Sequence, residues 1–377
     1  MGNPLVEVQR YGQSIWYDNI SRGLLLSGDL HRMVEEDGLL GVTSNPAIFE
    51  KAMAGSEDYL PATRALVAQG IDDPTELFER LAIQDIQLAA DVLHPAYQQT
   101  SRRDGYVSLE VSPHLANDTQ GTLADARRLW AAVGRENLMI KVPATGAGLP
   151  AIEQLIAEGV NVNVTLLFAV DAYADVAEAW LRGLERRADR GDALGSVASV
   201  ASFFVSRIDS LVDGRIEESG DDTLRPLLGR VAIANARLAY AHFRELLGSE
   251  RWKVLAAKGA QAQRVLWAST STKNPAYSKT LYVDELIGPD TVNTLPGDTF
   301  EAFRATGTVQ NALGTDFEAQ LEEARDRIAR LEAAGISLKA ATDQLLADGV
   351  KKFVDPFDSL LATIERRRDE IATREPM

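Results

Sequence analysis

The chain has 377 residues, a formal net charge of −16 and no cysteine. The acidic balance argues against a nucleic-acid partner or an anionic membrane surface, because binding to either needs a basic face. The lack of cysteine excludes disulfides, thiolate nucleophiles and thiolate-bound zinc. It fits a reducing compartment, so a cytoplasmic location is expected.

Other features of the chain argue against export, membrane insertion and metal binding. The segment 1–6 lacks the apolar core of a signal peptide, and Val6 does not fit a myristoylation signal. No uncharged apolar run approaches the roughly 20 residues of a membrane helix. The histidines are His31, His94, His114 and His242. No two of them have the helical spacing of metal ligands. We therefore expect no membrane partner and no metal site.

Short β-rich runs alternate with longer amphipathic stretches, which is typical of βα units and a parallel sheet. The predicted strands span 15–19, 40–45, 106–111, 138–142, 161–166, 197–204, 264–269 and 291–295. Segments such as 74–93 and 122–133 carry apolar residues three and four apart, and predict helices outside the sheet. Eight strands with interleaved helices favour a closed (β/α)8 barrel, or TIM barrel, of the α/β class.

The C-terminal part, from about residue 315 to 377, predicts further helices that pack on the barrel. Thr315 to Glu318 resembles a capping box that opens a helix over 317–334, and 355–374 predicts another helix. The absence of sustained heptads favours packed helices over a coiled coil. No repeat or linker-like shift in composition is visible, so we expect one domain over residues 1–377, as a monomer or a homodimer.

Lys141 lies in the middle of the apolar run 138–143, where a solvated lysine is not expected. A desolvated lysine loses its proton more easily and becomes a nucleophile toward carbonyl carbon. Taken alone, this lysine would more often extend its amine toward water or pair with Glu110. The polar residues on the neighbouring strands favour a chemical role instead.

Alternation along the predicted strands places several polar side chains inside the barrel, because residues i and i+2 share a face. The residues expected inside are Thr43, Asn45, Glu110, Lys141, Asn163 and Thr165, with Asp18 on the first strand on a face that the pattern leaves open. Each unsatisfied buried polar group would cost about 1 to 3 kcal/mol. They should therefore bond to one another or to a ligand, as in an active site.

These runs together resemble those of the transaldolases. The matching motifs are Gly-Val-Thr-Ser-Asn-Pro-Ala-Ile-Phe at 41–49, Ser-Leu-Glu-Val at 108–111, Met-Ile-Lys-Val-Pro-Ala-Thr at 139–145 and Asn-Val-Asn-Val-Thr-Leu-Leu-Phe at 161–168. They follow the family's order, and the resemblance runs from about residue 14 to 296. The chain is most similar to the longer bacterial branch of this family.

The resemblance implies a class I aldolase-type barrel in which Lys141 forms a Schiff base. It further implies that Asp18 is the general acid and base, and that Glu110 and Thr165 hold a catalytic water. The substrate contacts that it implies are Asn45, Asn163, Ser202, Phe204, Arg207 and Ser269. Shorter members place a second phosphate-binding arginine two residues after the serine. Here Lys273 would supply that charge, without the bidentate fork of arginine.

The implied reaction belongs to the pentose phosphate pathway. A dihydroxyacetone unit passes from sedoheptulose 7-phosphate to glyceraldehyde 3-phosphate, giving erythrose 4-phosphate and fructose 6-phosphate. No cofactor is implied, because the imine itself is the electron sink. Two alternatives stay open: a Schiff-base aldolase of the fructose-6-phosphate type, which cleaves without transfer, and a noncatalytic phosphosugar-binding barrel.

Some of these residues also have a purely structural interpretation. Asn45 precedes a proline and could only shape a βα turn. Arg207 could pair with Asp209 or Asp213 on a helix face. Glu110 could be no more than the counter-ion of the lysine. Of the expected contacts, Ser202 depends most on the resemblance.

Overall fold

Eight parallel strands close into a barrel in the computed structural model, which describes residues 2–374. The strands are β1 (Gln13–Tyr17), β2 (Gly41–Val42), β3 (Tyr106–Glu110), β4 (Leu138–Pro143), β5 (Val162–Leu167), β6 (Ser199–Phe204), β7 (Arg264–Ala268) and β8 (Thr291–Leu295). Each strand pairs in parallel with the next, and β8 closes the ring against β1. The predicted α/β class and (β/α)8 barrel are confirmed.

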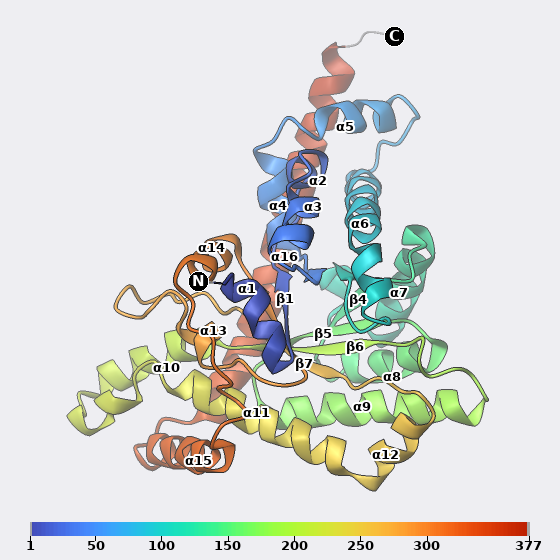
Figure 1. Ribbon diagram of the computed structural model, residues 1–377. Coiled ribbons are helices and arrows are strands. Elements are labelled where there is room, and N and C mark those ends of the chain that lie inside the picture. The colour runs from blue at the N-terminus through green and yellow to red at the C-terminus, as the bar shows by residue number, and fades with distance from the viewer. Residues whose placement is uncertain (1, 375–377) are drawn as a thin grey trace.

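Helices connect the strands and pack around them (Figure 1). They are α1 (Pro4–Glu7), α2 (Arg22–Leu26), α3 (Asp29–Glu36), α4 (Pro46–Ala54), α5 (Leu60–Val67), α6 (Pro74–Gln99), α7 (Thr119–Val133), α8 (Gly148–Glu158), α9 (Val170–Asp189), α10 (Ser206–Ser219), α11 (Val231–Gly248), α12 (Glu250–Ala257), α13 (Leu281–Asp284) and α14 (Gly297–Thr306). The helices predicted at 74–93 and 122–133 are α6 and α7. Asp73 and Asp118 begin them, since each carboxylate accepts a hydrogen bond from a free backbone amide of the first turn.

The main core lies between the strands and the surrounding helices. Ile140 and Val142 of β4, with Val162 and Val164 of β5, have no exposed surface. These two strands contact α7, α8 and α9. The alternate residues of β4 and β5 are therefore free to point to the inside of the barrel.

The first two strands end earlier than predicted. Asp18, Thr43 and Asn45 lie just past β1 and β2, in loops at the carboxyl end of the barrel, and not on the strands themselves. The backbone nevertheless continues along its neighbours: the Asp18 amide donates to the Leu295 carbonyl, and the Thr43 amide to the Tyr17 carbonyl. These bonds hold the loop residues next to the strand ends.

The helix predicted over 317–334 is α15 (Phe317–Ala333), which packs on α11. The expected capping box at its start is wrong. Asp316 precedes the helix in the left-handed conformation (φ 49°), and no described side chain caps the helix there. A capping box needs an extended backbone at that point. At the start of the helix, the Phe317 ring instead packs edge-on against Tyr240 of α11, with ring centroids 5.3 Å apart. The first turn of α15 is thus held by an aromatic contact in place of a side-chain cap.

The helix predicted from 355 is longer than expected. Helix α16 (Leu338–Arg374) is continuous and includes Pro356, although a proline removes one hydrogen bond and often kinks a helix. Buried residues on both sides, Phe353, Phe357 and Leu360, anchor it to the barrel. In Figure 1, α16 extends from the region of α10 past the strands to α5, and it contacts α4, α5, α6, α10 and β5.

None of the helices between residues 2 and 374 combines the length and the apolar character that crossing a membrane requires.

Candidate active site

Lys141 lies in the middle of β4, and its side chain is 6 % exposed. Its Nζ lies 3.2 Å from Glu110 Oε2 and donates a hydrogen bond to the main-chain carbonyl of Ser44 at 3.0 Å. The register pairs Glu110 with Lys141, and Lys141 with Asn163, across three adjacent strands. The pairing with Glu110 is one that the sequence suggested, whereas the contact with the Ser44 carbonyl was not expected.

Glu110, at the end of β3, is a buried carboxyl group. Burial raises the pKa of Glu110 to about 7, although the nearby Lys141 acts in the opposite direction. Among the described residues, its oxygens have no partner besides this ion pair, and the buried Thr165 hydroxyl has none. Because buried polar atoms are normally hydrogen-bonded, both side chains are suited to bind a small polar molecule.

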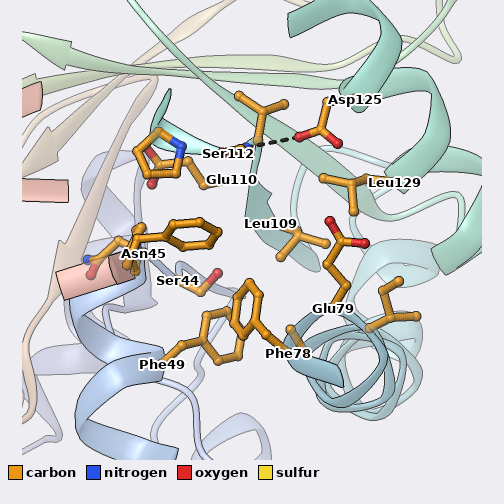
Figure 2. Close-up of a pocket in the computed structure, with 16 residues that line it drawn as sticks. Ser44, Asn45, Phe49, Phe78, Glu79, Leu109, Glu110, Ser112, Asp125 and Leu129 are labelled. Carbon is orange, nitrogen blue, oxygen red and sulfur yellow. Dashed lines mark hydrogen bonds between the residues drawn. The ribbon is translucent and has the colours of Figure 1, made fainter. Parts of the chain in front are cut away.

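A small cavity of about 30 Å³ borders Glu110 (Figure 2). Residues from β3, α4, α6, α7 and α16 line it, among them Phe49, Phe78 and Leu129. The space is enough for at least one water molecule, although most of the wall is apolar. Glu110 thus lies between this cavity and Lys141.

Asp18 is a second carboxyl group near the amine, in the loop after β1. Thr43 Oγ1 donates a hydrogen bond of 2.7 Å to Asp18 Oδ1, and lies 2.7 Å from the Thr294 hydroxyl. Burial raises the pKa of Asp18, while the positive charge of Lys141 is the strongest of several opposing effects. The carboxyl group is thus held by Thr43 from the loop after β2, and Thr294 of β8 contacts Thr43 in turn.

A cavity of about 160 Å³ opens at the carboxyl ends of the strands, directly over Lys141. Its lining residues are Asp18, Thr43, Asn45, Lys141, Thr165, Ser202, Phe204, Arg207, Ala268, Ser269, Ser271, Lys273, Thr294, Pro296 and Phe353. The predicted site residues Glu110 and Asn163 do not border it. Glu110 instead contacts Lys141, and Asn163 contacts Ser202, both of which line the cavity.

Two predicted amides have clear structural partners. Asn163 is completely buried, accepts a 2.7 Å hydrogen bond from Ser202 Oγ and donates one to Ser108 Oγ at 3.0 Å. Asn45 caps α4, because its side-chain oxygen accepts from the Ile48 amide at 3.0 Å. Asn45 therefore shapes the βα turn, which was its purely structural interpretation in the sequence, and it also lines the cavity.

Two cationic side chains border the cavity. Arg207, at the start of α10, lies over the Phe204 ring at 5.0 Å from its centroid, and its Nη1 is buried without a partner among residues 2–374. Lys273 donates to Ser271 Oγ at 2.6 Å. Partial burial lowers the pKa of Lys273, and the positive charge of Arg207 adds to this effect. Two unneutralised cations together make a site for an anion.

The alternative pairing of Arg207 with Asp209 or Asp213 is wrong. Asp209 accepts hydrogen bonds from the Ala232 amide and the Tyr282 hydroxyl, at 2.7 and 2.8 Å. Asp213 accepts from the Gly229 amide and the Tyr277 hydroxyl. Asp209 thus bonds to the first turns of α11 and α13, and Asp213 to the segments that precede these two helices. Arg207 is left to face the cavity.

The cavity continues outward into a wider groove of about 1080 Å³, which shares Asp18, Asn45 and Lys273 with it. Lys51 of α4 and Lys279 of the loop after β7 are further cations along this groove. An extended anionic molecule could therefore enter from the outside and place one end next to Lys141.

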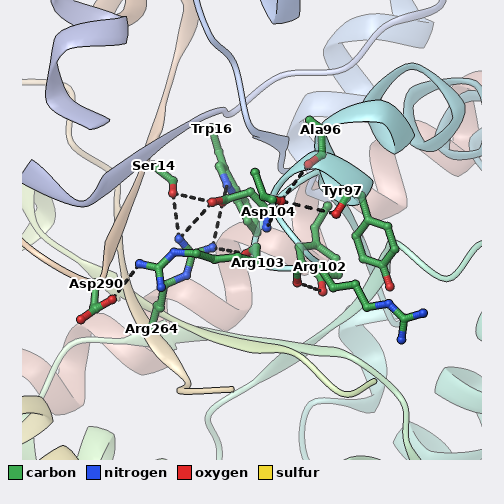
Figure 3. A network of polar contacts seen from close by, with 11 residues as sticks. Ser14, Trp16, Ala96, Tyr97, Arg102, Arg103, Asp104, Arg264 and Asp290 are labelled. Atoms are coloured by element: carbon green, nitrogen blue, oxygen red, sulfur yellow. Dashed lines mark hydrogen bonds and ion pairs between the residues drawn. The ribbon is translucent and has the colours of Figure 1, made fainter. Parts of the chain in front are cut away.

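The other end of the barrel is closed by a buried polar network (Figure 3). Arg264, the first residue of β7, donates to Asp104 at 2.8 Å and to Ser14 at 2.8 Å. The Trp16 indole donates to the same carboxylate at 3.0 Å. Arg264, Ser14 and Asp104 stand at or just before the amino ends of their strands, whereas the cavity over Lys141 lies at the carboxyl ends, as is usual in such barrels.

Several residues of the cavity wall were missed in the sequence, namely Ala268, Thr294, Pro296 and Phe353. Phe353 of α16 is 4 % exposed and lies over Lys141, with Nζ 5.2 Å from the ring centroid. No local pattern could have indicated this, because the residue belongs to a helix far along the chain that was predicted to start only at 355. In residues 2–374 no group of three or more histidine or carboxylate side chains is placed to hold a metal ion.

The fold and this site define a class: a (β/α)8 barrel with a buried lysine on the fourth strand, close to carboxyl groups and bordering a cavity that two cations also line. The family model described as transaldolase/fructose-6-phosphate aldolase matches residues 15–364. The chain belongs to this family, and it is an enzyme of the transaldolase type. The resemblance seen in the motifs is thereby confirmed.

Similar proteins extend over nearly the whole chain. A transaldolase of Trichodesmium erythraeum is 47 % identical over 376 residues, which is 97 % of each chain. Transaldolase 2 of Nostoc sp. (strain PCC 7120) is 49 % identical and covers 96 % of this chain and 97 % of its own. A transaldolase of Parafrankia sp. is 45 % identical, over 99 % of this chain and all of its own length.

Proposed function

We propose that this enzyme transfers a dihydroxyacetone unit from a ketose phosphate, sedoheptulose 7-phosphate, to glyceraldehyde 3-phosphate. The products are erythrose 4-phosphate and fructose 6-phosphate, as in the pentose phosphate pathway. The observation that carries the proposal is the buried amine of Lys141, 3.2 Å from Glu110, in the wall of a cavity that Arg207 and Lys273 also line. A nucleophile and two cations therefore border one cavity.

In the first step, the neutral amine of Lys141 attacks the ketose carbonyl and forms a carbinolamine. Glu110, through a water molecule that Thr165 helps to hold, supplies the proton with which the hydroxyl leaves as water. The pKa of about 7 suits Glu110 to give and take a proton near neutral pH. The product is a positively charged imine on Lys141.

In the second step, the imine draws in the electron pair of the C3–C4 bond. Asp18 takes the proton of the C4 hydroxyl, the aldose phosphate leaves, and a three-carbon enamine remains on Lys141. The Thr43 hydrogen bond fixes the position of Asp18 for this transfer. The acceptor aldehyde then reacts by the reverse sequence, so no cofactor takes part.

The remaining predicted residues position the sugar in this proposal. Asn45 binds a hydroxyl of the dihydroxyacetone unit directly, and Asn163 acts on another hydroxyl through Ser202, which lines the cavity and donates to Asn163. Arg207 and Lys273 bind the phosphate, while Phe204 and Ser269 form the wall near it. Lys273 in place of an arginine gives a point charge and no bidentate fork.

The test is a coupled assay with sedoheptulose 7-phosphate and glyceraldehyde 3-phosphate, together with borohydride trapping and peptide mapping. We expect the reduced adduct on Lys141, and transfer that exceeds the release of free dihydroxyacetone. Lys141→Ala should lose at least ~10³-fold in activity, because it removes the covalent nucleophile. An adduct on another residue would exclude this mechanism. Release of dihydroxyacetone without transfer would identify an aldolase of the fructose-6-phosphate type. Binding of the phosphosugar without any adduct would identify a noncatalytic binding barrel.

The proposal also includes a cytoplasmic location and a single domain over residues 1–377, in a monomer or a homodimer. Cell fractionation tests the location. Sedimentation of the purified chain distinguishes the two assemblies.

A further inference from the structure

An aromatic ring lies over the reacting amine. Phe353 of α16 places its ring 5.2 Å from Lys141 Nζ, measured to the ring centroid. The ring borders the same cavity as Asp18 and Thr165 and is 4 % exposed. It is therefore fixed in the cavity wall next to the nitrogen atom.

We propose that Phe353 is a positioning residue that stabilises the positively charged imine on Lys141 and keeps water from the enamine that follows it. This inference rests on the proposed Schiff-base function. The positive charge of the imine lies on the nitrogen atom, and the face of an aromatic ring attracts a cation within about 6 Å. A ring does so without offering a proton acceptor that would compete with Glu110 or Asp18.

The contrast with the other neighbours of the amine supports this assignment. Glu110 and the Ser44 carbonyl are both oxygen atoms that accept a proton or a hydrogen bond. Neither can exclude water from the carbon atoms of a bound intermediate. The enamine carbon must meet an aldehyde before water gives it a proton, and an apolar wall on the side of the nitrogen favours that outcome.

Helix α16 holds the ring in this position. Gly349, one turn before Phe353, lets the helix approach the end of β5, because a Cβ atom there would lie 2.9 Å from Leu166 Cδ2. One turn after Phe353, the Phe357 ring packs edge-on against Phe78 of α6, at 5.6 Å. The helix is thus anchored on both sides of the ring.

Three variants separate the role of the ring from that of apolar volume. Phe353→Leu removes the ring but keeps an apolar side chain, and Phe353→Tyr keeps the ring. Phe317→Leu is the matched control, because Phe317 of α15 also carries a cation over its ring: Arg244 lies 4.9 Å from the centroid. Phe317 does not border the cavity over Lys141.

The readouts are the fructose 6-phosphate concentration that gives half-maximal borohydride trapping, and the ratio of dihydroxyacetone released to dihydroxyacetone transferred. For Phe353→Leu we expect the half-trapping concentration to rise about 5-fold to 30-fold, the range of a desolvated cation–ring contact, and the released fraction to increase. Phe353→Tyr and Phe317→Leu should stay within about twofold of the unchanged enzyme.

The inference would be overturned if Phe353→Leu left both the half-trapping concentration and the released fraction of dihydroxyacetone unchanged. It would also be overturned if the leucine and tyrosine variants raised the half-trapping concentration equally, because the ring would then not matter. Failure of the proposed function looks different: the unchanged enzyme itself would show no adduct on Lys141.

Discussion

At the scale of single residues, the site depends on carboxyl groups whose proton affinity is set by their surroundings. Glu110 and Asp18 both lie near enough to Lys141 for its charge to act on them, and burial raises the pKa of both. Their environments differ, however: Asp18 accepts a hydrogen bond from Thr43, whereas Glu110 has only the lysine. This difference suits Glu110 to carry a proton at neutral pH and Asp18 to accept one.

The first prediction concerns the pH dependence of imine formation. Glu110 is protonated below pH 7 and ionised above it, so the dehydration step that uses its proton should slow as pH rises through about 7. Glu110→Gln should be at least ~10²-fold slower and should lose this pH dependence. Single-turnover trapping of fructose 6-phosphate between about pH 5.5 and 8.5 measures both.

The same shift gives a check on stability. A carboxyl group with a raised pKa in the folded state stabilises the fold fully only below its usual pKa of 4.5, and this contribution is lost as pH rises toward 7. Glu110→Gln should therefore weaken the decline in unfolding free energy over that range. A decline as steep as in the unchanged enzyme would mean that other groups cause it.

At the scale of elements, helix α16 contributes Phe353 to the wall of a cavity whose other residues come from the strands, the loops that follow them and the start of α10. It contacts β5 and α10 near the carboxyl ends of the strands, and α4 and α6 further along. Its approach to the barrel depends on Gly349, which faces the Leu166 and Phe168 side chains. Leu166 has a positive φ of 62° and lies where the pairing of β5 with β6 is irregular. The close contact thus falls where β5 departs from regular strand geometry.

The second prediction is that a large side chain at position 349 displaces α16. In Gly349→Leu the added atoms must enter the space of Leu166, so Phe353 should move away from Lys141. Overpacking of this kind usually costs about 1–3 kcal/mol of stability. We expect a raised ratio of released to transferred dihydroxyacetone at a temperature where the chain is still folded.

Gly214 offers a control for this substitution. It lies in α10, and a Cβ atom there would meet nothing within 4 Å. Gly214→Leu should leave the partition of the enamine unchanged. If both leucine variants behaved alike, the effect at position 349 would not come from the contact with β5.

At the scale of the whole molecule, the two ends of the barrel use buried polar residues for opposite purposes. At the amino ends of the strands, Arg264 and Asp104 pair with each other and with Ser14 and Trp16. At the carboxyl ends, Glu110, Thr165 and Arg207 keep polar atoms without partners in the described chain. The Arg264 network thus satisfies its own polar atoms, whereas the unpartnered atoms of Glu110, Thr165 and Arg207 are available to a ligand.

The third prediction tests this division of roles. Arg264→Ala leaves the Asp104 carboxylate buried without its cation, which typically costs about 3–5 kcal/mol. We expect that loss in the unfolding free energy measured by denaturant titration, with little change in KM for either substrate. Lys339→Ala, which breaks an exposed pair with Asp343 on α16, should change stability by no more than about 0.5 kcal/mol.

A large rise in KM in Arg264→Ala, at a denaturant concentration where the chain is folded, would contradict the purely structural role of this network.

The sequence alone determined the barrel and its main reactive groups. The period of apolar residues located all eight strands, and the isolated polar residues on β3, β4 and β5 indicated Glu110, Lys141, Asn163 and Thr165. These predictions succeeded because strand alternation is local: a residue's face follows from its immediate neighbours. The roles of these residues in the reaction stay predictions.

Only the tertiary structure decided the rest. It placed Asp18 and Asn45 in loops, gave α15 a start without a capping box, carried α16 through Pro356, and set Phe353 over Lys141. None of these follows from local pattern, because each depends on contacts between segments far apart in the chain. Such contacts exist only once the barrel has closed and α16 has packed across its open end.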